Sequence, residues 1–475
     1  MVLKVTNTLT GRKETFEPLI PGLVRIYVCG PTPYDHTHVG HARTYVVFDL
    51  VRRYLEYLGY TVFHVMNITD IDDKIIRKAR ELNVSWNEVP EKYTNEFIEV
   101  LSKLNIKMPH VMPKVTEHIR DIIEFIRDLI SKGYAYESNG SVYFNVDKFP
   151  DYGKLSKRKF KEEWRQEEEV LKEKKKPYDF ALWKKAKPGE PWWNSPWGPG
   201  RPGWHIECSV MSSKYLGPQF DIHGGGQDLI FPHHENEIAQ SEARFGLKPW
   251  VKYWLHVGYL TIKGEKMSKS LGNIISVHEI FKKYKPEVLR LYLLSSYYRN
   301  PMDFTWEGLE HTKLLYNRLV KVVEDSKRII LSGEPPYRVE SEIKKVVDRI
   351  VFLKRMFFEG LNDDFNMAKA MPYLHELISF SMRKLEESPF YTLALLVFSV
   401  FKEINEVLGV LDKYFYGAED VEKKLNSIVE AIVTVRHEFR MRKQYEVSDK
   451  IREALSKVGV KLFDSKDKTT WIIEY

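Results

Sequence analysis

The chain has 475 residues, too many for one small module and enough for about three domains of roughly 150 residues each. Hydrophobic residues make up 43% and aromatic residues 13% of it, which argues against a disordered chain, and the net charge of +7 permits a polyanionic partner without requiring one. No apolar run reaches the roughly 18 residues that span a bilayer, and the N-terminus lacks a secretory pattern, so we expect a cytoplasmic protein with no membrane partner.

The first elements predict a parallel β-sheet. An apolar run at 24–28 indicates a buried strand, and a Gly-Pro-rich loop leads from it to a helix over 38–58 that ends at Gly59. A second strand follows at 61–68. This order of strand, helix and strand is typical of parallel sheets.

The same sheet is predicted to resume after a long insertion at 107–203. Further strands are expected at 220–223 and 254–260, with a helix over 233–245 between them. The fold class is therefore α/β, with a doubly wound parallel sheet interrupted by a connective insertion. Ligands of such sheets bind beyond the carboxyl ends of the strands.

The insertion itself contains a helix at 116–132, a hairpin-like segment at 134–146 and a charged stretch at 157–176. That stretch carries nine Lys or Arg and six acidic residues. Because the signs are mixed, a solvated surface is favoured over a phosphate-binding tail.

Beyond about Gly308 the pattern is helical throughout. Leu315, Leu319 and Val322 recur at helical spacing, as do the apolar residues at 343, 346, 347 and 350. This pattern predicts an α-helical bundle.

The last segment, from about 421 onward, combines a long helix, a short helix at 448–458 and strand-like runs at 460–463 and 471–473. Its long helix carries a basic cluster, which could contact phosphates or simply form a solvated face. The cluster consists of Arg436, Arg440, Arg442 and Lys443.

A first candidate motif, His38-Val39-Gly40-His41, lies where the first strand has ended and the helix begins. The N-terminus of a helix presents free N–H groups and partial positive charge, which suit phosphates. The two histidines share one face of the first turn, and Gly40 permits close approach of a ring or backbone. A helix cap or two core histidines would give the same pattern.

A second candidate motif, Lys266-Met267-Ser268-Lys269-Ser270, lies in a glycine-flanked loop after a predicted strand. Two mobile ammonium groups suit the β and γ phosphates of a nucleotide. A solvated lysine loop is the alternative, but both motifs would lie at the same end of one sheet, which favours a shared nucleotide site.

The only two cysteines, Cys29 and Cys208, are too few for a disulfide framework and suit metal binding, although two inert buried thiols would also fit. Cys29 ends the first strand and Cys208 precedes the second half of the sheet. His233 and Glu237 lie four residues apart and share a helix face. Two thiolates, an imidazole and a carboxylate make a plausible zinc shell, in which His234 could replace His233 by spacing alone.

The two motifs resemble the His-Ile-Gly-His and Lys-Met-Ser-Lys-Ser signatures of the class I aminoacyl-tRNA synthetases, with Val39 as a conservative departure. The finer resemblance is to the cysteinyl-tRNA synthetase family. It is strong to about residue 303 and weaker beyond, where Asp-Asp-Phe-Asn at 363–366 is the clearest match. Four blocks carry it: 27–32 (Tyr-Val-Cys-Gly-Pro-Thr), 67–74 (Asn-Ile-Thr-Asp-Ile-Asp-Asp-Lys), 204–209 (Trp-His-Ile-Glu-Cys-Ser) and 223–237, from His-Gly-Gly-Gly to Pro-His-His-Glu-Asn-Glu.

This resemblance implies ATP-dependent ligation of L-cysteine to tRNA(Cys), with one Zn²⁺ per chain, Mg²⁺ accompanying ATP, and a class I Rossmann-type catalytic domain followed by a helical anticodon-binding bundle. It selects His233 over His234 as the third zinc ligand. The residues it implies for catalysis are His38, His41, Lys266 and Lys269; for ATP, these four with Thr32 and Gly40; for zinc, Cys29, Cys208, His233 and Glu237; for cysteine, Cys29, Thr69, Trp204, His223 and Asp228.

Six segments follow from the pattern and the resemblance together: 1–106, the first half of the catalytic domain; 107–203, the connective insertion; 204–262, the second half with the zinc site; 263–310, the lysine-motif loop and stem-contact region; 311–410, the anticodon-binding bundle; and 411–475, a small C-terminal module. We expect a monomer.

Two other functions remain open at this point. A cysteine:amino-sugar ligase of the same family would share the zinc site and both motifs, but would lack the full C-terminal region. A non-catalytic zinc-containing RNA-binding relative would be expected to lose His38, His41 or Lys269, and all three are present.

Overall fold

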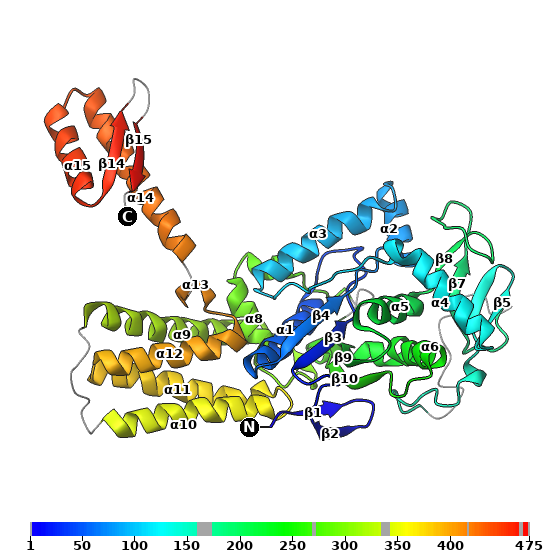
Figure 1. Cartoon of the computed structure of the whole chain (residues 1–475). Coiled ribbons are helices and arrows are strands. Elements are labelled where there is room, and N and C mark those ends of the chain that lie inside the picture. Colours follow the sequence, from blue (N-terminus) through cyan, green and yellow to red (C-terminus); the bar gives the residue numbers. More distant parts are fainter. Residues whose placement is uncertain are drawn as a thin grey trace. The chain divides into compact units, whose positions relative to one another are not determined.

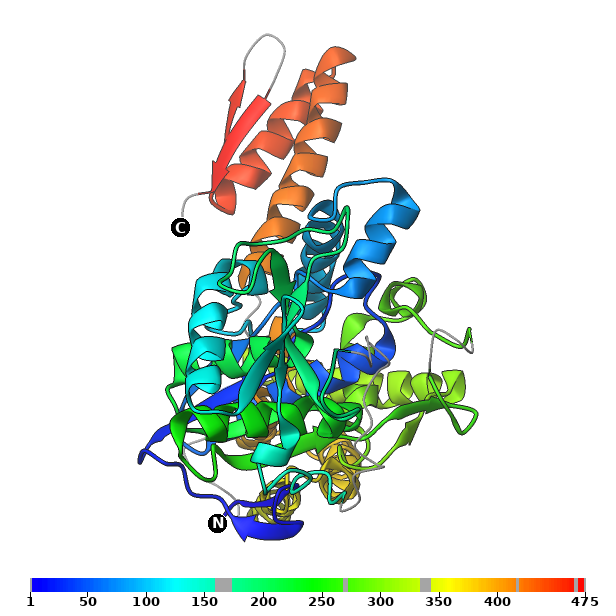
Figure 2. The same ribbon diagram turned by 90° about the vertical axis from the view of Figure 1, so that its right-hand side faces the viewer.

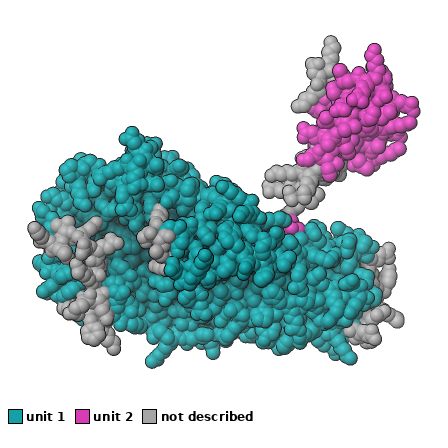
Figure 3. Space-filling model, turned by 180° about the vertical axis from the view of Figure 1, so that it is seen from behind, with its two compact units in different colours: residues 1–410 teal, residues 411–475 magenta. Residues whose placement is uncertain are grey.

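The computed structural model describes residues 2–158, 173–267, 272–333, 343–415, 418–464 and 469–473. The chain divides into two compact units, residues 1–410 and 411–475, which Figure 3 colours separately. In the part of the chain that the structure describes, no helix has the length and apolarity needed to cross a membrane.

The centre of the first unit is a four-stranded parallel sheet with the order β10-β9-β3-β4 (Figure 1). Its strands are β3 (Leu23–Val28), β4 (Thr61–Met66), β9 (Phe220–Gly226) and β10 (Val251–Val257). The predicted parallel sheet is thus confirmed.

The strand predicted at 254–260 differs from the structure, because β10 begins and ends earlier. The buried guanidinium of Arg43 donates to the carbonyls of Gly258 and Tyr259 at 2.8 and 3.0 Å, so these carbonyls bond to a side chain of α1 (Val39–Tyr57). The chain then enters a separate small sheet made of β11 (Leu260–Ile262), β12 (Glu265–Lys266) and β13 (Met302–Asp303).

Helices cover both faces of the parallel sheet. Neighbouring residues of a strand face opposite sides, and a Cβ on Gly224 would lie 2.0 Å from Phe48 of α1 (Val39–Tyr57), so α1 covers the Gly224 face. His223 points to the other face, where its ring meets Glu237 of α6 (Glu235–Phe245). α5 (Trp204–Leu216) packs beside α6 on that face.

The insertion between the halves of the sheet carries a four-stranded antiparallel sheet. The predicted helix is present as a short 3-10 turn, Val115–His118, followed by α4 (Ile119–Ser131), and the predicted hairpin as β5 (Ala135–Ser138) and β6 (Ser141–Phe144). Two strands were not predicted, β7 (Phe180–Lys185) and β8 (Gly200–Pro202). Most of the charged stretch, 159–172, lies outside the described residues.

Two helices connect β4 to the insertion, α2 (Asp73–Leu82) and α3 (Glu88–Lys103), and two short ones follow the lysine motif, α7 (Val277–Phe281) and α8 (Pro286–Leu294). The predicted bundle then follows with Leu315, Leu319 and Val322 all buried. Its helices are α9 (Trp306–Ser332), α10 (Ile343–Asn362), α11 (Met367–Glu387) and α12 (Tyr391–Leu408).

An N-terminal hairpin lies beside one end of this bundle (Figures 1 and 2). It consists of β1 (Lys4–Asn7) and β2 (Arg12–Thr15). The backbone N–H of Thr6 donates to the Asp364 carboxylate at 2.9 Å, and the amide of Asp364 donates to the carbonyl of Lys4, also at 2.9 Å.

The second unit folds around its own small core, formed by Val429, Val433, Leu455, Val460 and Leu462. Its elements are α13 (Asp412–Phe415), α14 (Ala418–Met441), α15 (Tyr445–Lys457), β14 (Val460–Asp464) and β15 (Thr469–Ile473), and the two predicted strands pair antiparallel.

The basic cluster of this unit is only partly free to meet a nucleic acid. Arg436 is 1% exposed and forms a two-pronged ion pair with Asp464, at 2.8 and 2.9 Å. Arg440 is exposed and binds the same carboxylate at 2.6 Å, and Arg442 and Lys443 are also exposed. Arg436 is therefore part of the packing of the unit rather than of a phosphate-binding surface.

Candidate active site

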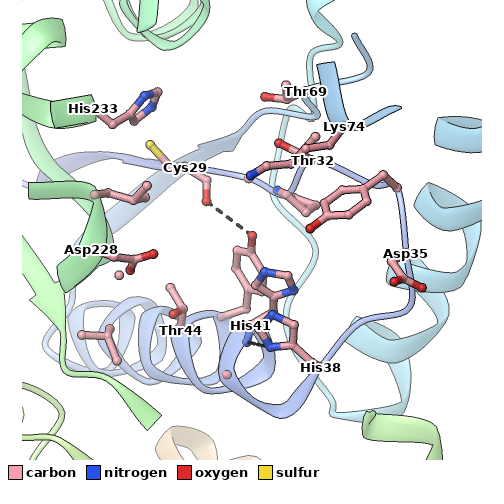
Figure 4. Close-up of a pocket in the computed structure, with 18 of the residues that line it drawn as sticks. Cys29, Thr32, Asp35, His38, His41, Thr44, Thr69, Lys74, Asp228 and His233 are labelled. Atoms are coloured by element: carbon pink, nitrogen blue, oxygen red, sulfur yellow. Dashed lines mark hydrogen bonds between the residues drawn. The ribbon is translucent and has the colours of Figure 1, made fainter. Parts of the chain in front are cut away.

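A cavity of about 590 Å³ opens at the carboxyl ends of all four parallel strands. Its walls come from the loop after β3, the first turns of α1, the segment after β4, and the segments after β9 and β10. This is the position at which doubly wound sheets bind their ligands. Figure 4 shows Cys29 and His233 on one side of the cavity and His38 and His41 on the other.

The first side holds a buried cluster of metal-donor atoms from four elements. The two sulfur atoms, Cys29 Sγ and Cys208 Sγ, lie 3.9 Å apart. Glu237 Oε1 lies 3.7 Å from Cys29 Sγ and 3.0 Å from His233 Nε2. One ligand atom from each of these four residues lies within 4.8 Å of all the others.

These separations fit a tetrahedral zinc ion. Zinc–sulfur and zinc–oxygen bonds of about 2.3 and 2.1 Å place two ligated sulfurs about 3.8 Å apart, and a sulfur and an oxygen about 3.6 Å apart. The observed values are 3.9 and 3.7 Å. The pair formed by His233 and Glu237, at 3.0 Å, is closer than the roughly 3.4 Å of a tetrahedral nitrogen and oxygen.

A second donor grouping shares Cys29 and Glu237 but takes His223 and His234 in place of Cys208 and His233. The Nε2 of His234 lies 3.2 Å from Cys29 Sγ. However, neither His223 nor His234 lines the cavity, whereas Cys29, Cys208 and His233 all do. The grouping with Cys208 and His233 is thus the one that a substrate in the cavity could reach.

Further side chains, of which His205 and His223 are buried, hold this cluster in place. His205 Nδ1 lies 3.0 Å from His233 Nδ1, so it orients the imidazole and leaves Nε2 directed at the cluster. His223 Nε2 lies 2.8 Å from Glu237 Oε2. The indole of Trp204 stacks on His233, with ring centroids 4.4 Å apart.

Burial and mutual contacts shift the pKa values of all four side chains in the cluster. Burial opposes ionisation of Cys208, but hydrogen bonds from Cys29 and His233 outweigh it and lower the pKa of that thiol to about 6. Burial likewise opposes the charged forms of His233 and Glu237, yet their mutual attraction raises the pKa of His233 to about 10 and, together with His223, lowers the pKa of Glu237 to about 2. Burial raises the pKa of Cys29 well above its usual range.

The opposite side of the cavity is formed by the two-histidine motif. His38 caps α1, and its Nδ1 accepts a hydrogen bond from the backbone N–H of His41 at 3.3 Å. The two rings stack with centroids 3.6 Å apart. A Cβ on Gly40 would lie 2.8 Å from Met267 Cε and 3.1 Å from His38 Nδ1, so glycine permits this close approach.

Backbone hydrogen bonds join the two motif regions. The N–H of Val39 donates to the carbonyl of Ile275, and the N–H of Val277 donates to the carbonyl of Thr37, both at 3.0 Å. Met267 itself lines the cavity. Two segments more than 200 residues apart in the sequence therefore meet at the first turn of α1.

The other predicted site residues are distributed as follows. Thr32, Thr69, Trp204 and Asp228 line the cavity. His223 does not line it, since it lies fully buried behind Glu237. The backbone of Lys266 belongs to β12, and Lys269 lies outside the described residues.

The sequence analysis gave no role to several residues that the structure brings to the site. Asn67 accepts a hydrogen bond from the N–H of Gly30 at 2.9 Å, and its Oδ1 lies 3.7 Å from Cys208 Sγ. Two exposed cations, Lys74 and Arg77, line the cavity beyond it. The block at 67–74 contained Asn67 and Lys74, but no spacing within it shows which of its side chains face a ligand.

Comparisons with known proteins identify the family of this chain. A family model described as "tRNA synthetases class I (C) catalytic domain" matches residues 15–314. The cysteine–tRNA ligases of Staphylothermus marinus and Aeropyrum pernix are each 52% identical to this chain, over 472 and 471 residues, with 99% of both chains covered in each case.

Among solved structures, methionyl-tRNA synthetase of Mycobacterium tuberculosis in complex with methionyl-adenylate has a similar fold, with a TM-score of 0.61 and 15% identity over 82% of this chain and 91% of that chain. The resemblance of the sequence motifs and the expected class I fold are thereby confirmed. This chain belongs to the cysteine–tRNA ligase family of the class I tRNA synthetases.

Proposed function

We propose that the chain joins L-cysteine to the 3′-terminal ribose of tRNA(Cys) in two steps that consume ATP, both within the 590 Å³ cavity. One observation carries this proposal: a single cavity has a buried set of two sulfurs, an imidazole and a carboxylate at one side, and a helix N-terminus with two histidines at the other. The first side suits a thiol amino acid and the second suits a triphosphate.

The metal of this proposal is one Zn²⁺ per chain, held by Cys29, Cys208, His233 and Glu237. What zinc supplies at such a site is a preference for thiolate sulfur over hydroxyl oxygen. The chain's own contribution is rigidity, because His205 and His223 fix His233 and Glu237 from behind.

Selection of cysteine over serine has a physical reason to use a metal. The two amino acids differ by one atom, and pocket shape alone gains only about 1 to 3 kcal/mol from so small a change. In the proposed binding mode, the ring of Trp204 and the hydroxyl of Thr69 border the substrate, and the Asp228 carboxylate faces its ammonium group. His223 contributes indirectly, through its hydrogen bond to Glu237.

In the first step, the cysteine carboxylate attacks the α-phosphate of ATP, forms cysteinyl-adenylate and releases pyrophosphate. The carboxylate is already ionised, so no general base is needed, and catalysis consists of alignment and charge stabilisation. We assign the phosphates to His38 and His41, and the leaving pyrophosphate to Lys266 and Lys269, with Mg²⁺ accompanying ATP. Thr32 and Gly40 border the nucleotide.

In the second step, the terminal ribose hydroxyl of the tRNA attacks the adenylate and releases AMP. We assign the tRNA contacts outside the cavity to the bundle at 311–410 and the module at 411–475. Arg440, Arg442 and Lys443 are exposed cations of the basic cluster in that module, and Arg440 is paired with Asp464. The six-segment division of the chain stays a prediction, and we expect a monomer.

The direct test incubates purified protein with ATP, Mg²⁺, labelled cysteine and total tRNA, and measures acid-precipitable cysteine. We expect charging that depends on both ATP and tRNA. If the protein catalyses cysteine-dependent exchange of pyrophosphate into ATP but does not charge tRNA, it activates cysteine for another acceptor, such as a small amine. Absence of both reactions in zinc-loaded protein would contradict the proposal.

A further inference from the structure

Three segments that are distant in the sequence bring a second group of metal-donor side chains together, outside the cluster of the cysteines. His36 comes from the loop before α1, Glu96 from α3 and His278 from α7. One ligand atom of each lies within 4.8 Å of the other two. Glu96 Oε1 contacts His278 Nε2 and lies 3.8 Å from His36 Nδ1, and the two rings meet edge to face with centroids 5.7 Å apart.

Each of the three side chains is held by a separate contact. The Glu96 carboxylate accepts hydrogen bonds from the N–H of Thr37 at 3.3 Å and from its hydroxyl at 2.9 Å. The ring of His36 packs edge to face on Tyr93, with centroids 5.4 Å apart. The backbone of His278 is fixed by the Ser276 side chain, which caps α7. The donors are therefore positioned before any ligand arrives.

Solvent reaches this group. The side chains of His36 and His278 are 54% and 33% exposed, and that of Glu96 is 12% exposed. The cysteine cluster, in contrast, is fully buried. No residue is common to the two groups, and only the cysteine cluster contains sulfur.

We propose that His36, Glu96 and His278 form a second metal site, which binds divalent transition metals of borderline softness, such as Zn²⁺, Ni²⁺ or Co²⁺, with water in the remaining coordination positions. Two imidazoles and one carboxylate are the donor types these ions prefer. Two donors of one such ion lie roughly 2.9 to 3.4 Å apart, so the spacing of 3.8 Å between His36 and Glu96 closes with a small side-chain movement.

Occupancy of this site would join the motif loop to α7. His36 lies two residues before His38, and the segment leading to α7 already pairs with His38 through Ser276. His36 also lines the main cavity. A metal at this site would therefore restrain the loop that carries the two-histidine motif, in addition to the hydrogen bonds and ring contacts that hold it.

Cobalt titration of protein loaded with one equivalent of zinc tests this inference without any measurement of ligase activity; it uses from the proposed function only the zinc at the cysteine cluster. With the cysteine cluster already filled by zinc, we expect one further equivalent of Co²⁺ to bind, giving weak visible absorption bands and no sulfur-to-cobalt charge-transfer band. His278→Gln and His36→Gln should each weaken this binding at least tenfold. His311→Gln, which changes an exposed histidine of α9, should leave it unchanged.

Several results would overturn the second site. The second site is ruled out if the unmodified protein binds no further equivalent of Co²⁺. It is also ruled out if the unmodified protein and both substituted variants bind Co²⁺ with equal affinity. A sulfur-to-cobalt band that rises as zinc is released would show exchange at the cysteine cluster instead.

Discussion

Two polar clusters, one in each unit, show that charged side chains in close contact can serve different purposes; in the second cluster only Arg436 is buried. The cluster of Cys29, Cys208, His233 and Glu237 directs its donor atoms at one another, and three of its members also border a cavity. The cluster around Asp464 directs three guanidinium groups, those of Arg436, Arg440 and Arg452, at one carboxylate.

The difference lies in what is left for a ligand. In the first unit, the cysteine cluster is arranged so that one ion could satisfy four donors at once. In the second, Asp464 and its arginines satisfy one another, and the hydroxyl of Thr469 adds a hydrogen bond at 2.8 Å. A set of functional side chains therefore indicates a binding site only when its own neighbours do not already complete it.

The largest expected effect comes from breaking the cluster of the first unit. Cys208→Ser replaces a soft sulfur donor by a hydroxyl, and we expect it to lower cysteine-dependent exchange of pyrophosphate into ATP by more than about 100-fold, beyond the 10- to 100-fold typical of changes behind a metal ligand. Metal analysis should show the loss of one zinc.

The control for that variant is Ser213→Ala. Ser213 lies on the same helix, and its replacement removes a hydrogen bond from its hydroxyl to the Ser209 carbonyl. It should keep both zinc and activity. Chelation of the unmodified protein provides the complementary measurement, because full cysteine activation by protein verified to be metal-free would contradict the assigned role of the cluster.

The corresponding change in the second unit should affect stability rather than activation. Asp464→Asn leaves the buried guanidinium of Arg436 without its counter-charge, which we expect to cost about 2 to 4 kcal/mol of the unfolding free energy of residues 411–475. Hydrogen exchange in α14 and α15 of the full chain measures the loss.

Asp449→Asn is the matched control, since it removes an exposed carboxylate from α15. It should leave the exchange rates nearly unchanged. If Asp464→Asn also leaves the exchange rates unchanged, the ion pairs between Asp464 and the arginines do not stabilise this unit, contrary to our expectation. Cysteine activation should be the same in both variants.

A smaller effect on zinc affinity is expected from His205, which contacts a proposed zinc ligand but does not belong to the cluster. His205→Leu removes the ring whose Nδ1 lies 3.0 Å from His233 Nδ1, and we expect zinc affinity to fall roughly tenfold. His205→Asn keeps an acceptor at nearly the same position and should restore most of it. Competition with a chelator of known affinity measures both, and equal losses in the two variants would point to packing instead.

The smallest expected effect is the loss of stability of the second unit at low pH. The hydrogen bonds and charge of Arg436, opposed by burial, lower the pKa of Asp464 below its usual range. The folded form then binds this proton less tightly than the unfolded form, so the contribution to stability is complete above about pH 4 and is lost as the pH falls below it. Hydrogen exchange of α15 between pH 5 and pH 3 should show this loss, and the Asp464→Asn variant should lack it.

Much of the fold follows from local pattern. The strands at β3 and β4, the helix α1 between them and the bundle beyond residue 306 were all predicted, because their apolar residues recur with the period of the element. β7 and β8 were not predicted. β8 has only three residues, and both strands are defined by the partners with which they pair.

The candidate site likewise contains residues that the sequence identifies and residues that only the fold identifies. The four proposed zinc ligands were recognisable by residue type and by family resemblance, and the structure brings their donor atoms together. His205 and Asn67 were not, because an ordinary histidine or asparagine gains its role from a neighbour that the fold supplies. Arg436 shows the reverse error, because the sequence offered it as a phosphate contact and the structure pairs it with Asp464. Its partner lies 28 positions further along the chain, and no local pattern links the two.

The pairing of β3 with β9 also has a consequence for the order of events during synthesis. Cys29 follows β3, but His233 and Glu237 follow β9, so 208 residues separate the first and last members of the cluster. At about 5 to 20 residues per second, the ribosome adds those residues in roughly 10 to 40 seconds. For most of that time the Cys29 thiol lacks the other three donors, and the set of four is complete only after the whole insertion has been synthesised.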